Sequence, residues 1–312
     1  MTHGSDGTAT GRVTTLREHL RAWFADHGRD LPWRATRDPY RILVSEVMLQ
    51  QTQAARVIPA YHAFLDRFPT LAALAAAPTA AVVEQWRGMG YNRRAVNLQR
   101  TARAVVADHG GMLPDTLDAL LALPGIGPYT ARAVLVFAHE RPTAAVDVNV
   151  ARVVQRAVIG TALAPKQRQQ AADELVADGP WPLAQALIEL GARHCTARTP
   201  RCDSCPIMGE CAWQLAGAPD PDPAATTRAA PQPFVGSNRY HRGRLLDALR
   251  AGPVDTDQLA AVSATDDRTR AGRLAADLVA DGLAAWSGGS LTLPEREPSD
   301  PTGANSKIEG TT

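Results

Sequence analysis

Hydrophobic residues recur at spacings of three and four along most of the chain, and this spacing predicts α-helices. The pattern is found in residues 15–28, 54–68, 93–110, 147–160 and 181–194. Runs in which β-branched and polar residues alternate are scarce, so strands are not expected there. We therefore expect residues 14–215 to form an all-α body whose helices are joined by short turns.

The periodic pattern stops on both sides of this body. Residues 216–233 concentrate Pro, Ala, Asp and Thr without a hydrophobic period, which indicates a linker. Residues 234–293 then predict three helices and a β-hairpin, an arrangement typical of a small winged-helix module. Residues 1–13 and 294–312 are small and polar, and we expect both ends to be disordered.

Composition and charge limit the classes of function. The 312 residues carry 33 Lys and Arg against 32 Asp and Glu, so a nucleic-acid partner must be bound by local basic patches. No stretch approaches the roughly 20 apolar residues of a membrane span, and the N-terminus lacks the basic start and apolar core of a signal peptide. We expect a cytoplasmic monomer without a membrane partner.

All four cysteines lie in one short segment, at Cys195, Cys202, Cys205 and Cys211. In a reducing compartment such a group indicates a metal site rather than a set of disulfides. Structural zinc usually takes two cysteine pairs separated by a dozen or more residues, whereas this loop has the spacing C-x6-C-x2-C-x5-C. Four thiolates in one compact loop favour a [4Fe-4S] cluster, with zinc as the alternative.

The segment LPGIGPYT (123–130) predicts a tight turn between two helices. Gly125 and Gly127 allow a ligand to approach the backbone closely, and the N–H groups at the start of the second helix point toward it. An anion such as a DNA phosphate fits this arrangement. An ordinary turn between two packed helices is the alternative interpretation.

Two carboxylates lie in contrasting settings. Glu46 is on the apolar face of a helix, near Ile42, Leu43 and Leu49. Burial there raises the pKa of a carboxyl group, so Glu46 is a candidate general acid, unless it only pairs with an arginine. Asp147 immediately precedes a helix, where it is either a simple N-cap or an ionised carboxylate facing a cationic transition state. Cleavage of a glycosidic bond requires two carboxylates with such different roles.

The turn GMGY (88–91) contains two candidate contacts with a nucleic acid. Met89 and Tyr91 lie on this turn, where an apolar or aromatic side chain can enter a stack of bases. Packing in the protein core is the alternative for both residues.

Together these motifs resemble the adenine DNA glycosylases of the MutY type, within the helix-hairpin-helix glycosylase superfamily that includes endonuclease III. The resemblance extends over about residues 14–215 and rests on RDLPWR, DPYRILVSEVMLQQTQ, GMGYNRRAVNL, LPGIGPYT, VDVNV and the four-cysteine loop. It implies a helix-hairpin-helix DNA glycosylase fold, with a six-helix barrel and an iron–sulfur cluster domain. It also implies a monofunctional enzyme of base excision repair. Such an enzyme flips adenine mispaired with 8-oxoguanine or guanine out of double-stranded DNA and hydrolyses its N-glycosidic bond.

The resemblance further implies roles for individual residues. Glu46 protonates the adenine at N7, while Asp147, helped by Asn149 and Tyr129, stabilises the sugar cation. The adenine pocket is lined by Arg29, Leu31, Trp33, Arg34 and Gln185. The contacts with DNA come from Gln51, Thr52, Met89, Tyr91, Gly125 and Gly127. Strand-nicking relatives carry a Schiff-base lysine at the position of Tyr129, so we expect base removal without efficient strand cleavage.

The chain departs from the family pattern at three places. Asn92 replaces a second aromatic residue, and Val148 replaces a glycine. Beyond the linker the family usually has a pyrophosphohydrolase-like domain that inspects the oxidised guanine, whereas this chain has the winged-helix-like module. The preference for 8-oxoguanine over guanine is therefore open. Two other functions remain alternatives: a thymine or uracil mismatch glycosylase, and a non-catalytic iron–sulfur protein that binds DNA.

Overall fold

The structure is a computed structural model that describes residues 5–220, 222–224 and 233–294. The outer parts of the two predicted disordered ends and most of the second half of the predicted linker lie outside the described residues. Among the described helices, none is long and apolar enough to cross a membrane. The chain divides into two compact units, the first made of residues 1–72 and 100–231 and the second of residues 73–99 and 232–312.

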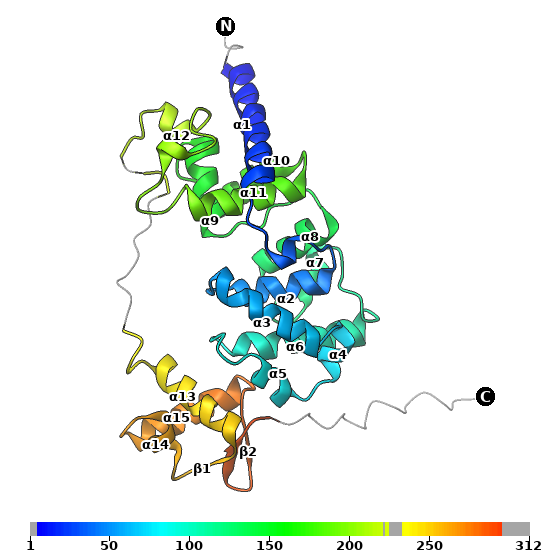
Figure 1. The fold of residues 1–312 in the computed structure, drawn as a ribbon, viewed down its shortest axis with the longest axis vertical. Helices are drawn as coiled ribbons and strands as arrows, with labels where there is room; N and C mark the ends of the chain where they lie inside the picture. The colour runs from blue at the N-terminus through cyan, green and yellow to red at the C-terminus, as the bar shows by residue number, and fades with distance from the viewer. Residues whose placement is uncertain (1–4, 221, 225–232, 295–312) are drawn as a thin grey trace, which may run out of the picture. The chain divides into compact units, whose positions relative to one another are not determined.

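The first unit is helical in its described part, which confirms the expected all-α body (Figure 1). Its elements are α1 (Ser5–His27), η1 (Pro32–Arg34), α2 (Pro39–Leu49), α3 (Ala54–Arg67), α7 (Leu117–Ala122), α8 (Pro128–His139), α9 (Val148–Val153), the π-helical turn η2 (Val154–Ile159), α10 (Pro165–Val176), α11 (Pro180–Arg193), η3 (Cys202–Ser204) and α12 (Ala212–Leu215). The division between the units falls within α4 (Leu71–Ala76) and α6 (Arg93–Asp108).

The core of the first unit is formed by the apolar faces of its helices. Helix α2 packs against α8, and α11 packs against both α1 and α9. These helices contribute Leu20, Ile42, Val136, Val153 and Leu187, all of which are buried in one cluster. Burial of such faces is the main favourable contribution to folding, and it brings together helices that are distant in sequence.

Helix α1 begins at Ser5, whereas the sequence predicted disorder through residue 13. Distant contacts hold this part of the helix in place. The Arg12 guanidinium donates hydrogen bonds to the backbone oxygens of Ala157 (3.0 Å), Glu210 (2.6 Å) and Val158 (2.7 Å). Hydrophobic periodicity reports only on near neighbours in the sequence, so it cannot reveal hydrogen bonds from Arg12 to residues 157, 158 and 210. The prediction of disorder through residue 13 was wrong for this reason.

The second unit combines residues 73–99 with the C-terminal module. Its elements are α5 (Thr79–Gln85), α13 (Asn238–Ala251), β1 (Val254–Asp255), α14 (Leu259–Ser263), α15 (Arg268–Ala280), β2 (Ala285–Ser287) and β3 (Ser290–Thr292). The strands form an antiparallel sheet in the order β1-β3-β2. The three predicted helices and the hairpin are confirmed, and β1 is a two-residue strand that the sequence pattern did not predict.

The grouping of residues 73–99 with the module follows from a shared core. Val83 of α5 and Val96 of α6 are buried in one cluster with Leu245, Leu274 and Leu291 of the module. From the sequence pattern, residues 73–99 were expected to belong to the catalytic region. The contacts between described residues instead group residues 73–99 with the C-terminal module.

Candidate active site

Glu46 lies in the middle of α2 and its side chain is buried, with 5% of the residue exposed. Burial raises the pKa of Glu46 to about 7, and the negative charge of Asp147 acts in the same direction. A hydrogen bond with the Tyr129 side chain and the charge of Arg34 oppose this change only partly. A carboxyl group with this pKa is half protonated near neutral pH, which is the property that a general acid needs.

Asp147 is the N-cap of α9, and its carboxylate accepts three hydrogen bonds. Oδ1 accepts from the backbone N–H groups of Asn149 and Val150, each at 2.8 Å, and Oδ2 accepts from the Asn149 amide nitrogen at 2.8 Å. These donors and the N-terminus of the helix suit a negative charge. The two carboxylates thus differ in their surroundings, since Glu46 is removed from water by burial and Asp147 is bound by three N–H donors.

Asn149 is held by a second residue and by a close approach of two helices. Its side-chain oxygen accepts from Arg152 Nη2 at 2.8 Å, and Arg152 also donates to the backbone oxygens of Gly191 and Cys195. A Cβ atom at Gly191 would lie 2.7 Å from Cβ of Asn149, so only glycine fits there. Gly191 and Arg152 were missed by the sequence analysis, because their importance depends on contacts between α9 and α11.

Tyr129 lies in the first turn of α8, the second helix of the helix–turn–helix that the sequence predicted. The turn between α7 and α8 contains Gly125 at φ +81°, a backbone conformation that favours glycine, and Gly127 is the N-cap of α8. A Cβ atom at Gly127 would have no neighbour within 4 Å, so the start of α8 is open to a ligand. Tyr129 is half-buried one residue beyond Pro128, and burial raises its pKa well above the ordinary value, so its hydroxyl stays protonated.

Three of the five residues expected in the adenine pocket, Arg29, Arg34 and Gln185, belong to one hydrogen-bond network. Arg34 donates to the side-chain oxygen of Gln185 at 2.8 Å and to the Glu189 carboxylate at 2.8 Å. Arg29 donates to both oxygens of Glu189, at 2.7 and 3.0 Å. Trp33 is buried and packs edge-on against Tyr61, with 5.6 Å between ring centroids. Leu31, the fifth, is also buried.

Glu189 is the centre of this network and was not identified from the sequence. Its side chain is completely buried. Burial alone would raise its pKa, but the hydrogen bonds and charges of Arg29 and Arg34 outweigh burial and lower the pKa below the ordinary value. In the sequence, Glu189 is the one glutamate in residues 181–194 and lies on the apolar face of this helix. Its role becomes clear only when its arginine partners are known.

The residues expected to contact DNA have different exposures. Gln51 is exposed at the end of α2 with φ +56°, and Thr52 beside it is half-buried. In the second unit, Tyr91 is 40% exposed, whereas Met89 is 4% exposed. The structure therefore places Met89 in the protein core, and the expected contact of its side chain with DNA is not supported.

The four cysteines line one cavity, as their spacing predicted. The empty volume is about 370 Å³, and Leu190 and Ile207 contribute apolar walls. Among the described residues, no three Cys, His, Asp or Glu side chains converge on a point where one metal ion would bind. A zinc ion requires sulfurs about 2.3 Å from a single point, whereas each iron of a cluster binds its own thiolate. The four cysteines that line this cavity supply one thiolate for each iron of a [4Fe-4S] cluster, which would hold this loop by four iron–thiolate bonds.

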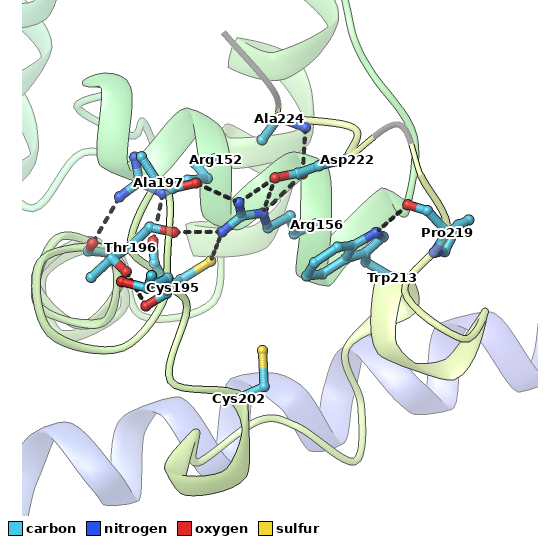
Figure 2. Close-up of polar contacts among 12 residues, drawn as sticks. Arg152, Arg156, Cys195, Thr196, Ala197, Cys202, Trp213, Pro219, Asp222 and Ala224 are labelled. Atoms are coloured by element: carbon cyan, nitrogen blue, oxygen red, sulfur yellow. Dashed lines mark hydrogen bonds and ion pairs between the residues drawn. The ribbon is translucent and has the colours of Figure 1, made fainter.

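Arg156 on the π-helical turn η2 is buried beside this cavity (Figure 2). Its Nη1 donates to Cys195 Sγ at 3.5 Å and to the Thr196 oxygen at 2.8 Å. Its Nη2 donates to the Ala197 oxygen at 3.1 Å, and Nε donates to both carboxylate oxygens of Asp222, at 3.0 and 3.1 Å. An N–H donor to a ligand sulfur is one of the features that set the potential of an iron–sulfur cluster.

Asp222 belongs to the segment that the sequence predicted as a linker. Besides its bonds with Arg156, this segment is attached through Pro219, whose backbone oxygen accepts from the Trp213 indole N–H at 3.1 Å (Figure 2). The Trp213 ring in turn lies 5.1 Å from the guanidinium carbon of Arg156. The described residues in the first half of the predicted linker are therefore bound, through Arg156 and Trp213, next to the cysteine loop.

Comparison with known families assigns both regions of the first unit. Residues 44–178 match the HhH-GPD superfamily of base excision DNA repair proteins, and residues 195–211 match the iron–sulfur binding domain of endonuclease III. The first match includes Glu46, Tyr129 and Asp147, and the second includes all four cysteines. The cofactor of the cysteine loop is a [4Fe-4S] cluster.

Comparison with individual proteins extends the match beyond the first unit. The chain is 44% identical over 297 residues to an adenine DNA glycosylase from Mycobacterium tuberculosis (strain CDC 1551 / Oshkosh), which covers 92% of this chain and 96% of that protein. An adenine DNA glycosylase from Homo sapiens is 42% identical over 64% of this chain and 39% of its own length. A solved structure of a thermostable thymine-DNA glycosylase has a TM-score of 0.62 at 30% identity, covering 66% of this chain and 98% of its own. Because the mycobacterial relative matches nearly the full length of both chains, this protein belongs to the adenine DNA glycosylase family of the HhH-GPD superfamily.

Proposed function

We propose that this protein is a monofunctional DNA glycosylase of base excision repair that acts as a monomer on double-stranded DNA. Its substrate is adenine mispaired with 8-oxoguanine or guanine, and it hydrolyses the bond between this base and deoxyribose. The observation that carries the proposal is the buried carboxyl of Glu46, with a pKa of about 7, next to the Tyr129 hydroxyl and close to Asp147. Membership of the adenine DNA glycosylase family supports the choice of base.

Glu46 supplies the proton that makes adenine a good leaving group. As the bond between C1′ and N9 breaks, the carboxyl proton moves to N7, and the base leaves as neutral adenine rather than as an anion. The resulting carboxylate then accepts a proton from the water that attacks C1′, which restores the acid. Burial of Glu46 makes this cycle possible near neutral pH, because an exposed glutamate would already have lost its proton.

Asp147 stabilises the positive charge that develops on the sugar. Its three N–H donors fix the carboxylate in one orientation, so the charge is in place before the bond breaks. Such a fixed charge costs no reorganisation during the reaction, which is the basis of electrostatic stabilisation of a transition state. Asn149 provides two of the donors and is itself held by Arg152.

Tyr129 limits the reaction to removal of the base. A protonated hydroxyl can hydrogen-bond Glu46 but cannot form the Schiff base through which a lysine leads to strand cleavage. The chain has only two lysines. Lys166 lies on α10, and Lys307 lies outside the described residues. The open N-terminus of α8 beside Gly127 supports binding of a duplex phosphate near Tyr129.

Single-turnover excision on a panel of mispairs tests this function. We expect the holoprotein to release adenine from duplexes that contain A opposite 8-oxoguanine or A opposite guanine. Glu46→Gln should lower the rate by about 10²- to 10⁴-fold, the range typical of a lost general acid. Glu174→Gln makes the same chemical change at an exposed position of α10 and should leave the rate unchanged.

The panel also separates the competing functions. Release of thymine or uracil opposite guanine, without release of adenine, would identify a pyrimidine mismatch glycosylase. One of the similar solved structures is that of a thymine-DNA glycosylase. Tight binding without release of any base would identify a non-catalytic protein. Efficient trapping of a covalent adduct with DNA by borohydride would contradict the monofunctional mechanism, since such trapping requires a Schiff base.

A further inference from the structure

Tyr91 combines three properties that rarely occur together. Its side chain is 40% exposed, its backbone has φ +46°, and it follows Gly88 and Gly90, which also have positive φ. A non-glycine residue in this backbone region is strained, and such strain persists only where the surrounding structure imposes it. An exposed aromatic side chain in a strained turn therefore indicates a function for the turn and a partner that holds it.

The partner is an arginine of the C-terminal module. Arg239, near the start of α13, donates a hydrogen bond from Nη1 to the Tyr91 hydroxyl at 2.7 Å. Its guanidinium carbon also lies 5.6 Å from the centroid of the Tyr91 ring and 4.9 Å from that of Phe234. Phe234 is 51% exposed. Tyr91 is distant in the sequence from Phe234 and Arg239, yet the two exposed aromatic rings and the arginine form a single patch on the second unit.

The module also contacts residues on both sides of the turn. Arg250 Nη2 donates to the side-chain oxygen of Asn92 and to the backbone oxygen of Val83, both at 3.0 Å. Arg94, on the following helix α6, donates to the backbone oxygens of Met89 and Gly90, both at 3.0 Å. The conformation of the turn is therefore determined partly by residues more than 140 positions later in the chain.

We propose that Arg239 is a positioning residue for Tyr91, and that the C-terminal module thereby sets how the enzyme discriminates between bases opposite the adenine. This inference rests on the proposed function. The patch of Tyr91, Arg239 and Phe234 has the chemistry of a nucleic-acid surface, because aromatic rings stack on bases and guanidinium groups attract the phosphate backbone. Arg239 fixes the Tyr91 ring in one orientation before DNA binds, so less entropy is lost on binding.

The test is the ratio of single-turnover rate constants for adenine opposite 8-oxoguanine and adenine opposite guanine, measured with the full-length holoprotein. We expect Arg239→Met to change this ratio by about threefold to tenfold, the effect of losing one hydrogen bond of ordinary strength at a partly exposed position. Arg244→Met removes the same charge from an exposed position on the same helix and should leave the ratio unchanged. Arg239→Lys keeps the charge but loses the planar group, so it should resemble Arg239→Met.

A double-mutant cycle shows whether Arg239 acts through Tyr91. Tyr91→Phe removes only the hydroxyl that accepts the bond, so Arg239→Met should have a smaller effect in this background than alone. A role of Arg239 in folding of the module would give additive effects instead. Fluorescence of 2-aminopurine placed beside the mispair provides a second measurement, because it reports unstacking by an inserted ring. We expect Arg239→Met and Tyr91→Phe to reduce the signal to a similar extent.

The inference and the proposed function fail in distinguishable ways. If the wild-type protein releases no adenine, the proposed function is wrong, and the 2-aminopurine signal still decides the role of Arg239. If adenine is released but the rate ratio and the fluorescence of Arg239→Met equal those of the wild type, the inference is wrong. If Arg239→Met does not fold, as judged by circular dichroism, Arg239→Lys and Tyr91→Phe provide the same comparison.

Discussion

The raised pKa of Glu46 predicts how the stability of the protein depends on pH. In the folded state this carboxyl is buried and has a pKa of about 7, whereas the ordinary value is 4.5. Between these two values the folded protein keeps a proton that the unfolded chain has lost. The free energy of unfolding therefore falls as pH rises through this window. At 1.36 kcal/mol for each pKa unit, the full difference is about 3 kcal/mol.

Glu46→Gln removes this dependence, because glutamine does not ionise. The variant loses the same contacts at every pH, so a constant difference from the wild type is expected in addition to the pH-dependent one. Between pH 5.5 and 8.5 the wild type should lose about 2 kcal/mol relative to the variant, from the same two pKa values. Urea unfolding of both holoproteins, followed by circular dichroism at four pH values in this range, measures the difference directly.

Comparison of two proteins at each pH cancels the titration of all groups that they share. Glu174→Gln is the matched control, since its exposed side chain should give a difference from the wild type that does not change with pH. The excision rate of the wild type should fall in the same window, as the acid loses its proton. A Glu46→Gln difference that stays constant from pH 5.5 to 8.5 would show that the carboxyl is hydrated, and burial could then not explain its role as an acid.

Two further predictions concern carboxylates that pair with buried arginines, Asp222 with Arg156 beside the cysteine cavity and Glu189 with Arg34 in the expected adenine pocket. Asp222→Asn should speed the loss of cluster absorbance in the presence of a chelator by about tenfold, because a hydrogen bond between charged groups contributes about 1.5–3 kcal/mol. Asp220→Asn in the same segment is the control, and equal rates for the two variants would contradict this role. Glu189→Gln should lower the free energy of unfolding by about 3 kcal/mol, because it leaves the charge of Arg34 buried without its partner. Thermal unfolding beside Glu174→Gln measures this loss, and a change no larger than the control's would refute it.

Hydrophobic periodicity was sufficient to predict the helices, because burial of apolar faces determines where they form. Residues 54–68 and 181–194 became α3 (Ala54–Arg67) and α11 (Pro180–Arg193), within one residue of the predicted ends. The pattern failed where polar contacts between distant segments decide the structure. Arg12 extends α1 toward the N-terminus, and Asp222 binds part of the predicted linker to Arg156.

In the candidate site too, features that depend on near neighbours in the sequence could be predicted, and features that depend on distant contacts could not. The sequence could indicate that Glu46 lies on an apolar face and that Asp147 precedes a helix, since both statements depend only on near neighbours. It could not place Glu189 between two arginines, because the partners lie about 160 residues earlier. Nor could it show that Met89 is buried while Tyr91 is exposed, since both residues occupy the same short turn.

The different surroundings of the two carboxylates follow from where each lies relative to its helix. Glu46 is within α2, where every backbone N–H of its own turn is already bonded inside the helix, so its carboxyl finds few donors and its pKa rises. Asp147 precedes α9, where the first N–H groups have no partner within the helix and bind the carboxylate instead. Exchanging the two environments would require moving helix ends rather than side chains. The division of roles that we propose, between acid and counter-charge, is therefore supported by the backbone, which gives two chemically similar side chains different surroundings.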